Sequence, residues 1–102
     1  MPPVEVTFAD PYWDELETNE NCKSRLDKRV VRGYRRLLRF IRDSTDERDL
    51  RASPKHFEKL KGDRSHQYSM QIDEKWRLVF EIMPSRPKNT IHVIAVEDYH
   101  KG

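Results

Sequence analysis

Three segments in the last third of the chain place the strongest constraint on its fold. Apolar and polar residues alternate along them, which is typical of β-strands that pack one face against a core. The segments are 67–72, 76–82 and 90–96. Only residues 73–75 separate the first two, and so short a connection suits an antiparallel hairpin. The proline-containing segment 83–89 predicts a loop before the third. The third is almost continuously apolar and predicts an interior strand covered on both faces, with Ile91, Val93 and Ala95 on one of them.

The first half of the chain predicts a short strand and two helices. Residues 4–8 alternate and suit a short strand at a sheet edge, and Asp10-Pro11 marks the start of a short helix. A longer helix follows, with Ser24 as its N-cap and Asp27 three residues later, close to a capping box. Its apolar residues recur at spacings of three and four and form one stripe: Leu26, Val30, Tyr34, Leu37, Leu38 and Ile41.

The segment 43–54 is polar and acidic, and we expect a loop there with at most one irregular turn. The order of elements is then strand, helix, helix and three antiparallel strands. We expect one α+β domain over residues 1–102. In it, the short N-terminal strand and the two helices precede a three-stranded antiparallel sheet that completes a small mixed sheet.

Charge is segregated along the chain, although the formal net charge is only +2. The stretch 23–42 holds nine lysines and arginines against one acid, Asp27, whereas acids gather at 10–20 and 43–49. A basic helix of this kind creates a local positive potential, which favours nucleic acid or an acidic protein as a partner. A solvated helix face is the ordinary alternative.

The single cysteine, Cys22, excludes an internal disulfide and indicates a reducing compartment. One cysteine and scattered histidines provide no spacing for zinc ligands, and no apolar run approaches the length of a membrane span. The first residues also lack the apolar segment of a secretory signal. We therefore expect a soluble, cytoplasmic protein with no metal or other cofactor and no membrane partner.

Four short motifs follow one another in the second half of the chain. They are Leu60-Lys61-Gly62, Tyr68-Ser69, Trp76-Arg77-Leu78-Val79-Phe80 and Asp98-Tyr99-His100. In this order and at this spacing they resemble the RelE/ParE toxin superfamily, specifically its HigB-like branch. Two positions depart from that pattern, because Gln71 stands where many relatives carry Arg and Asp73 where they carry Asn. One positive charge and one turn amide are therefore missing near the expected groove.

The resemblance implies the toxin of a type II toxin-antitoxin system, which cleaves messenger RNA in the ribosomal A site without a metal ion. The attacking group would be the substrate's own 2′-hydroxyl. Such an enzyme needs a base for that hydroxyl, an acid for the leaving 5′-oxygen, and positive charge for the transition state.

The resemblance also assigns roles to particular residues. Arg77 would grip the phosphate from a rigid strand, Lys61 would contact the scissile phosphate, and Tyr99 and His100 would serve in stacking and proton transfer. The supporting residues would be Arg64, Asp98, Lys59 and His56. From the residues alone, Arg77 is equally well an ion-paired strand arginine and Lys61 a solvated lysine. Residues 99–100 by themselves also suit a frayed chain end.

Two alternatives to the nuclease remain open at this stage. ParE-like relatives share the fold and inhibit DNA gyrase without cutting RNA, and an inactive module that binds only RNA or an antitoxin fits the departures at Gln71 and Asp73. In each case we expect an antitoxin as partner, in this branch a HigA-like helix-turn-helix protein. Operator DNA would be bound only through that antitoxin, and messenger RNA and the ribosome would be the targets of the nuclease. The basic helix would then contact ribosomal RNA or be masked by the antitoxin.

Overall fold

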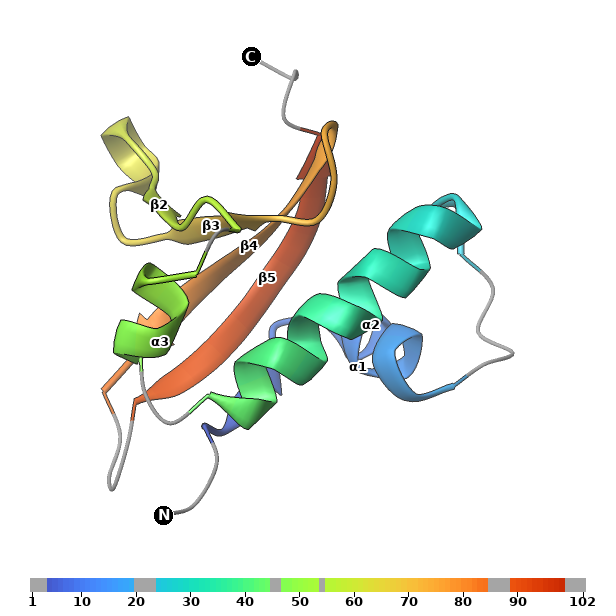
Figure 1. Cartoon of the computed structure of the whole chain (residues 1–102), viewed down its shortest axis with the longest axis horizontal. Coiled ribbons are helices and arrows are strands. Elements are labelled where there is room, and N and C mark those ends of the chain that lie inside the picture. The colour runs from blue at the N-terminus through green and yellow to red at the C-terminus, as the bar shows by residue number, and fades with distance from the viewer. Residues whose placement is uncertain (1–3, 20–23, 45–46, 54, 85–88, 99–102) are drawn as a thin grey trace.

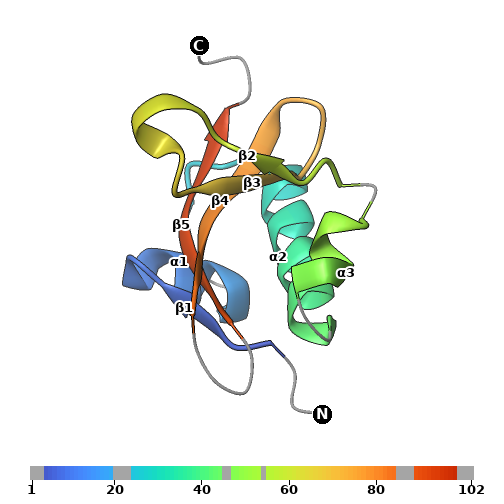
Figure 2. The ribbon, with the colours of Figure 1, turned by 90° about the vertical axis from the view of Figure 1, so that its left-hand side faces the viewer.

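The computed structural model describes residues 4–19, 24–44, 47–53, 55–84 and 89–98. The elements are β1 (Val6–Phe8), α1 (Pro11–Thr18), α2 (Lys28–Asp43), α3 (Glu47–Arg51), β2 (Glu58–Lys59), the 3-10 turn η1 (Gly62–Arg64), β3 (Tyr68–Gln71), β4 (Trp76–Met83) and β5 (Thr90–Asp98). The five strands form one mixed sheet in the order β1-β5-β4-β3-β2. Figure 1 shows α1 and α2 together on the same side of β5, and Figure 2 shows α3 beside α2.

The sheet confirms the α+β fold class and the three antiparallel strands near the chain end. β3 pairs with β4 and β4 with β5, both antiparallel, whereas β1 pairs with β5 in parallel. β1 lies at the edge of the sheet, as its short alternating segment predicts, and β5 lies in the interior between β1 and β4.

Two expectations for β5 are wrong. The register between β4 and β5 shifts after Val79, which pairs with Ala95, while Phe80 pairs with Val93. The extra residue, Ile94, reverses the alternation, so that Val96 and not Ala95 joins Ile91 and Val93 in the core. The second face is also not fully covered, because its residues are only half-buried. They are His92, Ile94 and Ala95.

The core lies between the helices and the sheet. In α2 the predicted stripe is confirmed within the helix, because Val30, Tyr34, Leu37, Leu38 and Ile41 are all buried. They pack with residues of α1, α3 and the sheet: Leu16, Leu50, Met70, Leu78, Phe80, Ile91 and Val93. Gly33 allows the helix to approach the sheet closely, since a Cβ at that position would lie 2.7 Å from Ile72 Cγ2.

The start of α2 differs from the expectation of a cap at Ser24. The N-cap is Asp27, whose carboxylate accepts a hydrogen bond from the Arg29 N–H at 2.8 Å. The Ser24 hydroxyl instead accepts from the Leu26 N–H at 3.0 Å and pairs with the Tyr12 hydroxyl at 2.7 Å. Because this local turn uses the serine oxygen, the helix begins at Lys28, three residues later than a cap at Ser24 would place it. At the first helix, Asp10 accepts from the Tyr12 N–H, which confirms the predicted start.

Two elements have no counterpart in the sequence-based expectation. The segment expected to be a loop contains α3, which Leu50 anchors with no exposed surface. A fifth strand, β2, pairs with β3 at the edge opposite β1, and both of its side chains are exposed. A five-residue helix shows too little periodicity to predict, and a two-residue edge strand has no buried face to produce alternation.

Candidate active site

Arg77 lies on an interior strand of the sheet, between an acidic side chain on one neighbouring strand and an amide side chain on the other. On β4 it faces Gln71 of β3 and Glu97 of β5. Its side chain is only 16% exposed, and its Nη2 lies 3.5 Å from Glu97 Oε1. Because Gln71 is neutral, no charge repels Arg77 from the β3 side at this register position. The departure from the family pattern at residue 71 is therefore directly beside the arginine expected to bind phosphate.

Arg64 reaches the same carboxylate from the turn η1. It donates from Nη1 to Glu97 Oε1 at 3.0 Å and from Nη2 to Glu97 Oε2 at 2.6 Å. Its Nε donates to Gln67 Oε1 at 3.0 Å, so the guanidinium plane is fixed on two sides. We call Arg64, Arg77 and Glu97 the Glu97 clasp. It joins a turn near one sheet edge to two interior strands.

The charges in the clasp stabilise each other. Burial alone would raise the pKa of Glu97, but hydrogen bonds and charge from Arg64, together with Arg77, outweigh it and lower that pKa below its usual value. The hydrogen bond to Glu97 in turn raises the pKa of Arg64. Two guanidinium groups and one ionised carboxylate give the clasp a net charge of +1.

Lys61 sits at the start of the turn that carries Arg64. Gly62 adopts φ +68°, in the left-handed region that favours glycine, and the turn closes through a hydrogen bond from the Ser65 N–H to the Gly62 carbonyl at 3.1 Å. The Lys61 side chain is exposed. Because Arg64 is fixed to Glu97 near the end of β5, the turn that begins after Lys61 is anchored to that strand.

The other predicted site residues divide into three groups. Asp98 ends β5 opposite Trp76, and its Oδ2 lies 3.8 Å from Nζ of Lys75, which belongs to the β3–β4 turn. Tyr99 and His100 follow directly and lie outside the described residues. His56 and Lys59 are exposed before and on β2, and no hydrogen bond or ion pair within the described residues joins either to the clasp.

Sequence reasoning missed Glu97, which holds the two arginines together. It stands immediately before the Asp98-Tyr99-His100 motif, and the antiparallel register places it directly opposite Arg77. An acid on the last strand is a signal only when that register is known. The bulge that begins after Val79 makes the register hard to count backward from the apolar residues.

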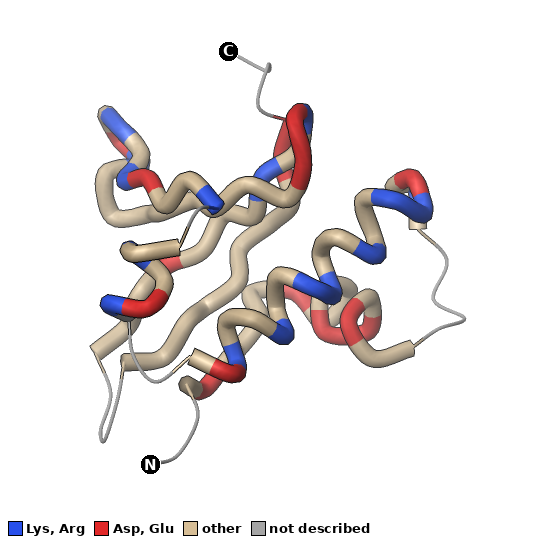
Figure 3. The backbone as a smooth tube through the Cα atoms, in the orientation of Figure 1, with Lys and Arg blue, Asp and Glu red and all other residues tan. Residues whose placement is uncertain are grey.

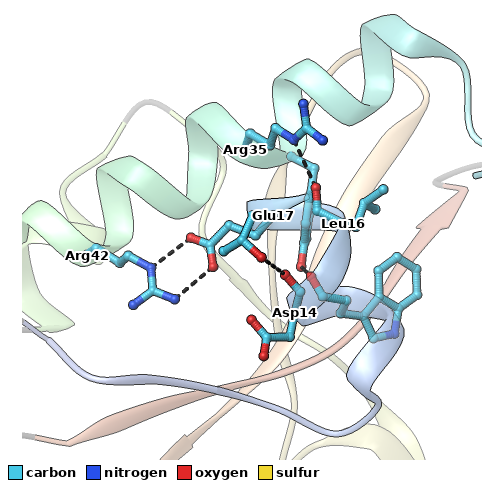
Figure 4. A network of polar contacts seen from close by, with 8 residues as sticks. Asp14, Leu16, Glu17, Arg35 and Arg42 are labelled. Atoms are coloured by element: carbon cyan, nitrogen blue, oxygen red, sulfur yellow. Dashed lines mark hydrogen bonds and ion pairs between the residues drawn. The ribbon is translucent and has the colours of Figure 1, made fainter. Parts of the chain in front are cut away.

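The arginines of α2 serve two different purposes. Arg42 forms a two-pronged ion pair with Glu17, both bonds 2.7 Å, and Arg35 donates from Nε to the Leu16 carbonyl at 2.9 Å (Figure 4). These two side chains fasten α2 to α1. A second set is exposed and forms no ion pair within the part of the chain that the structure describes. It consists of Arg29, Arg32, Arg36 and Arg39. Figure 3 shows that basic residues recur along the whole of α2.

An apolar pocket opens beside the exposed arginines. It has a volume of about 300 Å³ and lies between α2, the end of β3 and the segment after α3. Its lining is Gly33, Arg36, Leu37, Phe40, Ser53, Lys55, Gln71 and Ile72. Phe40 is 39% exposed, which is unusual for so large an apolar side chain. Apolar surface with a basic rim therefore marks this side of α2.

The described residues form neither a cluster of potential metal ligands nor a membrane-spanning helix. No group of three or more histidine, cysteine, aspartate or glutamate side chains there is arranged to hold a metal ion. None of the described helices combines the length and the apolar character needed to cross a membrane.

Comparisons with known proteins identify the family of the chain. The model of the HigB-like toxin family, described as the RelE-like toxin of type II toxin-antitoxin system HigB, matches residues 6–100. No curated protein sequence matches significantly.

Among solved structures, the chain is similar to the YoeB/ParE toxin from Agrobacterium tumefaciens, with 24% identity and a TM-score of 0.64 over 95% of this chain and 100% of that one. It is also similar to a chain of the YoeB-YefM complex from Staphylococcus aureus, with 23% identity and a TM-score of 0.60 over 95% and 97%. At these identities the structural similarity shows the fold. The family match covers nearly the whole chain, and the protein therefore belongs to the HigB-like family of RelE-like toxins of type II toxin-antitoxin systems.

Proposed function

We propose that this toxin is a metal-independent endoribonuclease that cuts messenger RNA during translation. The observation that carries the proposal is the convergence of Arg64 and Arg77 on one carboxylate oxygen of Glu97, at 3.0 and 3.5 Å. Guanidinium groups that grip a carboxylate in this way suit a phosphate equally well, because both anions accept parallel N–H bonds. Arg77 stands on an interior strand, which gives the phosphate a rigid binding partner.

The proposed reaction uses the substrate's own nucleophile. The 2′-oxygen attacks the adjacent phosphorus, the bond from phosphorus to the 5′-oxygen breaks, and a 2′,3′-cyclic phosphate and a 5′-hydroxyl form. A base removes the proton of the 2′-hydroxyl, and an acid donates a proton to the leaving 5′-oxygen. Arg77, Lys61 and Arg64 would stabilise the extra negative charge of the transition state, which is usually the largest single contribution.

Proton transfer is assigned to the residues after β5. A histidine side chain has an unperturbed pKa of about 6.5, so His100 suits the role of acid or base. Tyr99 would stack on a base or donate its hydroxyl, and Asp98 would orient the histidine or a neighbouring cation. His56 and Lys59 would contact the RNA backbone farther along β2.

We further propose a HigA-like antitoxin as the partner that silences this activity and that binds the operator DNA. The similar chain from S. aureus belongs to a complex of YoeB with YefM, which supports an antitoxin for this chain as well. The basic rim and apolar floor of the pocket beside α2 suit an acidic segment with a bulky apolar side chain. Replacing Arg36 and Arg39 together by Glu should weaken the complex at least tenfold in a titration calorimetry experiment with the cognate antitoxin, while Lys28→Glu, at the first turn of α2, should not.

Induced expression tests the nuclease directly. The wild type should arrest growth and produce new messenger RNA 5′ ends inside translated regions, whereas Arg77→Ala and His100→Ala should be folded and harmless. Lys28→Ala removes a positive charge from the exposed first turn of α2 and should remain toxic. Growth arrest with intact messages and accumulating DNA breaks would contradict the nuclease and favour the ParE-like inhibition of gyrase. A wild type that causes no arrest would favour the inactive module.

A further inference from the structure

The proposed phosphate-binding arginines already share an anion within the protein. Both carboxylate oxygens of Glu97 accept from Arg64, at 3.0 and 2.6 Å, and Arg77 Nη2 lies 3.5 Å from one of them. The Glu97 side chain is 31% exposed, so solvent and a ligand can reach it. A carboxylate and a phosphate use the same parallel bonds to a guanidinium, and both would compete for the same donors.

We propose that Glu97 is a positioning residue of the RNA site. Its carboxylate holds Arg64 and Arg77 side by side, and it releases some of their N–H groups when a phosphate binds. This inference rests on the proposed function. In the free protein the carboxylate fixes the turn η1, which begins after Lys61, against the start of β4 and the end of β5. When RNA binds, the phosphate takes over donors that Glu97 occupied.

The charge of the clasp favours this role over a purely structural ion pair. Two arginines and one glutamate leave an excess of one positive charge, and Arg77 is only 16% exposed. A net positive charge among these three side chains attracts an anion such as the phosphate of RNA. The low pKa of Glu97 keeps its carboxylate charged, so the competition persists across the neutral pH range.

The inference predicts opposite effects on binding and on cleavage. Glu97→Gln keeps the size of the side chain but removes its charge, and it should strengthen the binding of single-stranded RNA. One additional neutralised phosphate contributes about 0.7 to the slope of log affinity against log salt concentration. Between 50 and 200 mM salt the variant should therefore lose about threefold more affinity than the wild type. Cleavage at saturation should fall about ten- to a hundredfold, because the arginines and Lys61 are no longer held in place.

A matched control is available on the neighbouring strand. Glu81 of β4 is also 31% exposed and also faces a basic group, His66, at 3.7 Å, but it contacts no clasp residue in the described part of the chain. Glu81→Gln thus removes the same charge from a similar environment and should change neither the salt dependence nor the rate. Glu97→Asp keeps the charge on a shorter side chain, so it should restore the wild-type salt dependence and only part of the rate.

The experiment measures binding and cleavage separately. Binding is followed by fluorescence anisotropy with a fluorescent 2′-O-methyl oligonucleotide, which lacks the attacking hydroxyl, and cleavage by single-turnover kinetics on ribosomes programmed with a short messenger RNA. Tighter, more salt-sensitive binding with slower cleavage in Glu97→Gln supports the inference. Unchanged binding and an unchanged rate per folded molecule would overturn it, even if the variant melts at a lower temperature.

Two further outcomes are decisive. If Glu97→Gln does not fold, Glu97→Asp alone carries the test, and a salt dependence that differs from the wild type would overturn the inference. A wild type that binds the oligonucleotide but cuts no messenger RNA contradicts the proposed nuclease and leaves the binding comparison valid.

Discussion

Replacing Gly33 by Ala should destabilise the fold, although alanine is the better helix former. Gly33 lies in the middle of α2, and in an exposed helix the change to Ala would gain about 1 kcal/mol. Here the new methyl group would lie 2.7 Å from Ile72 Cγ2, whereas carbon atoms in contact are normally about 3.5 Å or more apart. The helix or the strand must therefore move by about 0.8 Å, the difference between these two distances.

The side chain of Ile72 cannot give way easily. Its Cγ2 is bonded directly to the β-branched Cβ, so the methyl group moves only if χ1 leaves its preferred well or the backbone shifts. Overpacking of this kind typically costs about 1–3 kcal/mol. After the gain in helix propensity is subtracted, Gly33→Ala should lower the free energy of unfolding by up to about 2 kcal/mol.

Urea denaturation followed by circular dichroism measures this effect, and a double-mutant cycle with Ile72→Ala identifies its cause. Ile72→Ala removes the methyl group that clashes, so Gly33→Ala should become stabilising in that background. The coupling free energy between the two positions should reach about 1–3 kcal/mol. A stabilising Gly33→Ala in the wild-type background, or a coupling below about 0.5 kcal/mol, would refute the close approach as the reason for glycine here.

Three further changes test the packing around α1, α2 and α3. Tyr34→Phe removes the hydrogen bond from the buried hydroxyl to the Trp13 carbonyl, 2.7 Å long, and should cost about 1–3 kcal/mol in thermal unfolding. Burial raises the pKa of Tyr34, so the hydroxyl loses its proton at a lower pH in the unfolded chain than in the folded protein. The free energy of unfolding of the wild type should therefore decrease above about pH 10. In a pH series, Tyr34→Phe should lack this contribution to the decrease. Arg42→Ala breaks the two-pronged ion pair with Glu17. Because the Arg42 side chain is 40% exposed, the free energy of unfolding should fall by only about 1 kcal/mol, and a double-mutant cycle with Glu17→Ala would isolate this contribution. Leu50→Ala should cost about 2–4 kcal/mol by urea denaturation, and a smaller loss would contradict the anchoring of α3.

The parts of the fold that follow from local patterns could be predicted from the sequence. The stripe from Val30 to Ile41 marks one side of α2 because a helix repeats every 3.6 residues, and all five of its helical members are buried. The strands β3 and β4 alternate with period two, and the short turn between them allows only antiparallel pairing.

The features that could not be predicted from the sequence depend on contacts between residues far apart in the chain. No local rule shows that Ile94 is the extra residue of a bulge, because its neighbours on both sides are apolar as well. Asp27 and not Ser24 caps α2 because the Ser24 hydroxyl pairs with Tyr12 of another helix. Leu50 carries a helix too short to show a period. In the candidate site, the family motif points to Arg77, but the partnership of Arg64 with Glu97 spans 33 residues of sequence.

The separation of the arginines on α2 gives a way to distinguish effects on folding from effects on function. Arg35 and Arg42 are hydrogen-bonded to α1, so their loss should lower stability and leave the chemistry of the sheet intact. Arg36 and Arg39 are exposed and contribute to a surface, so their loss should leave stability almost unchanged and alter only the recognition of a partner. The Glu97 clasp is formed by residues of β4, β5 and η1 and includes no residue of α2. If a variant loses toxicity but keeps its stability, the position of the substitution shows which function has failed. A change on the exposed face of α2 indicates lost recognition, and a change in the clasp indicates lost cleavage.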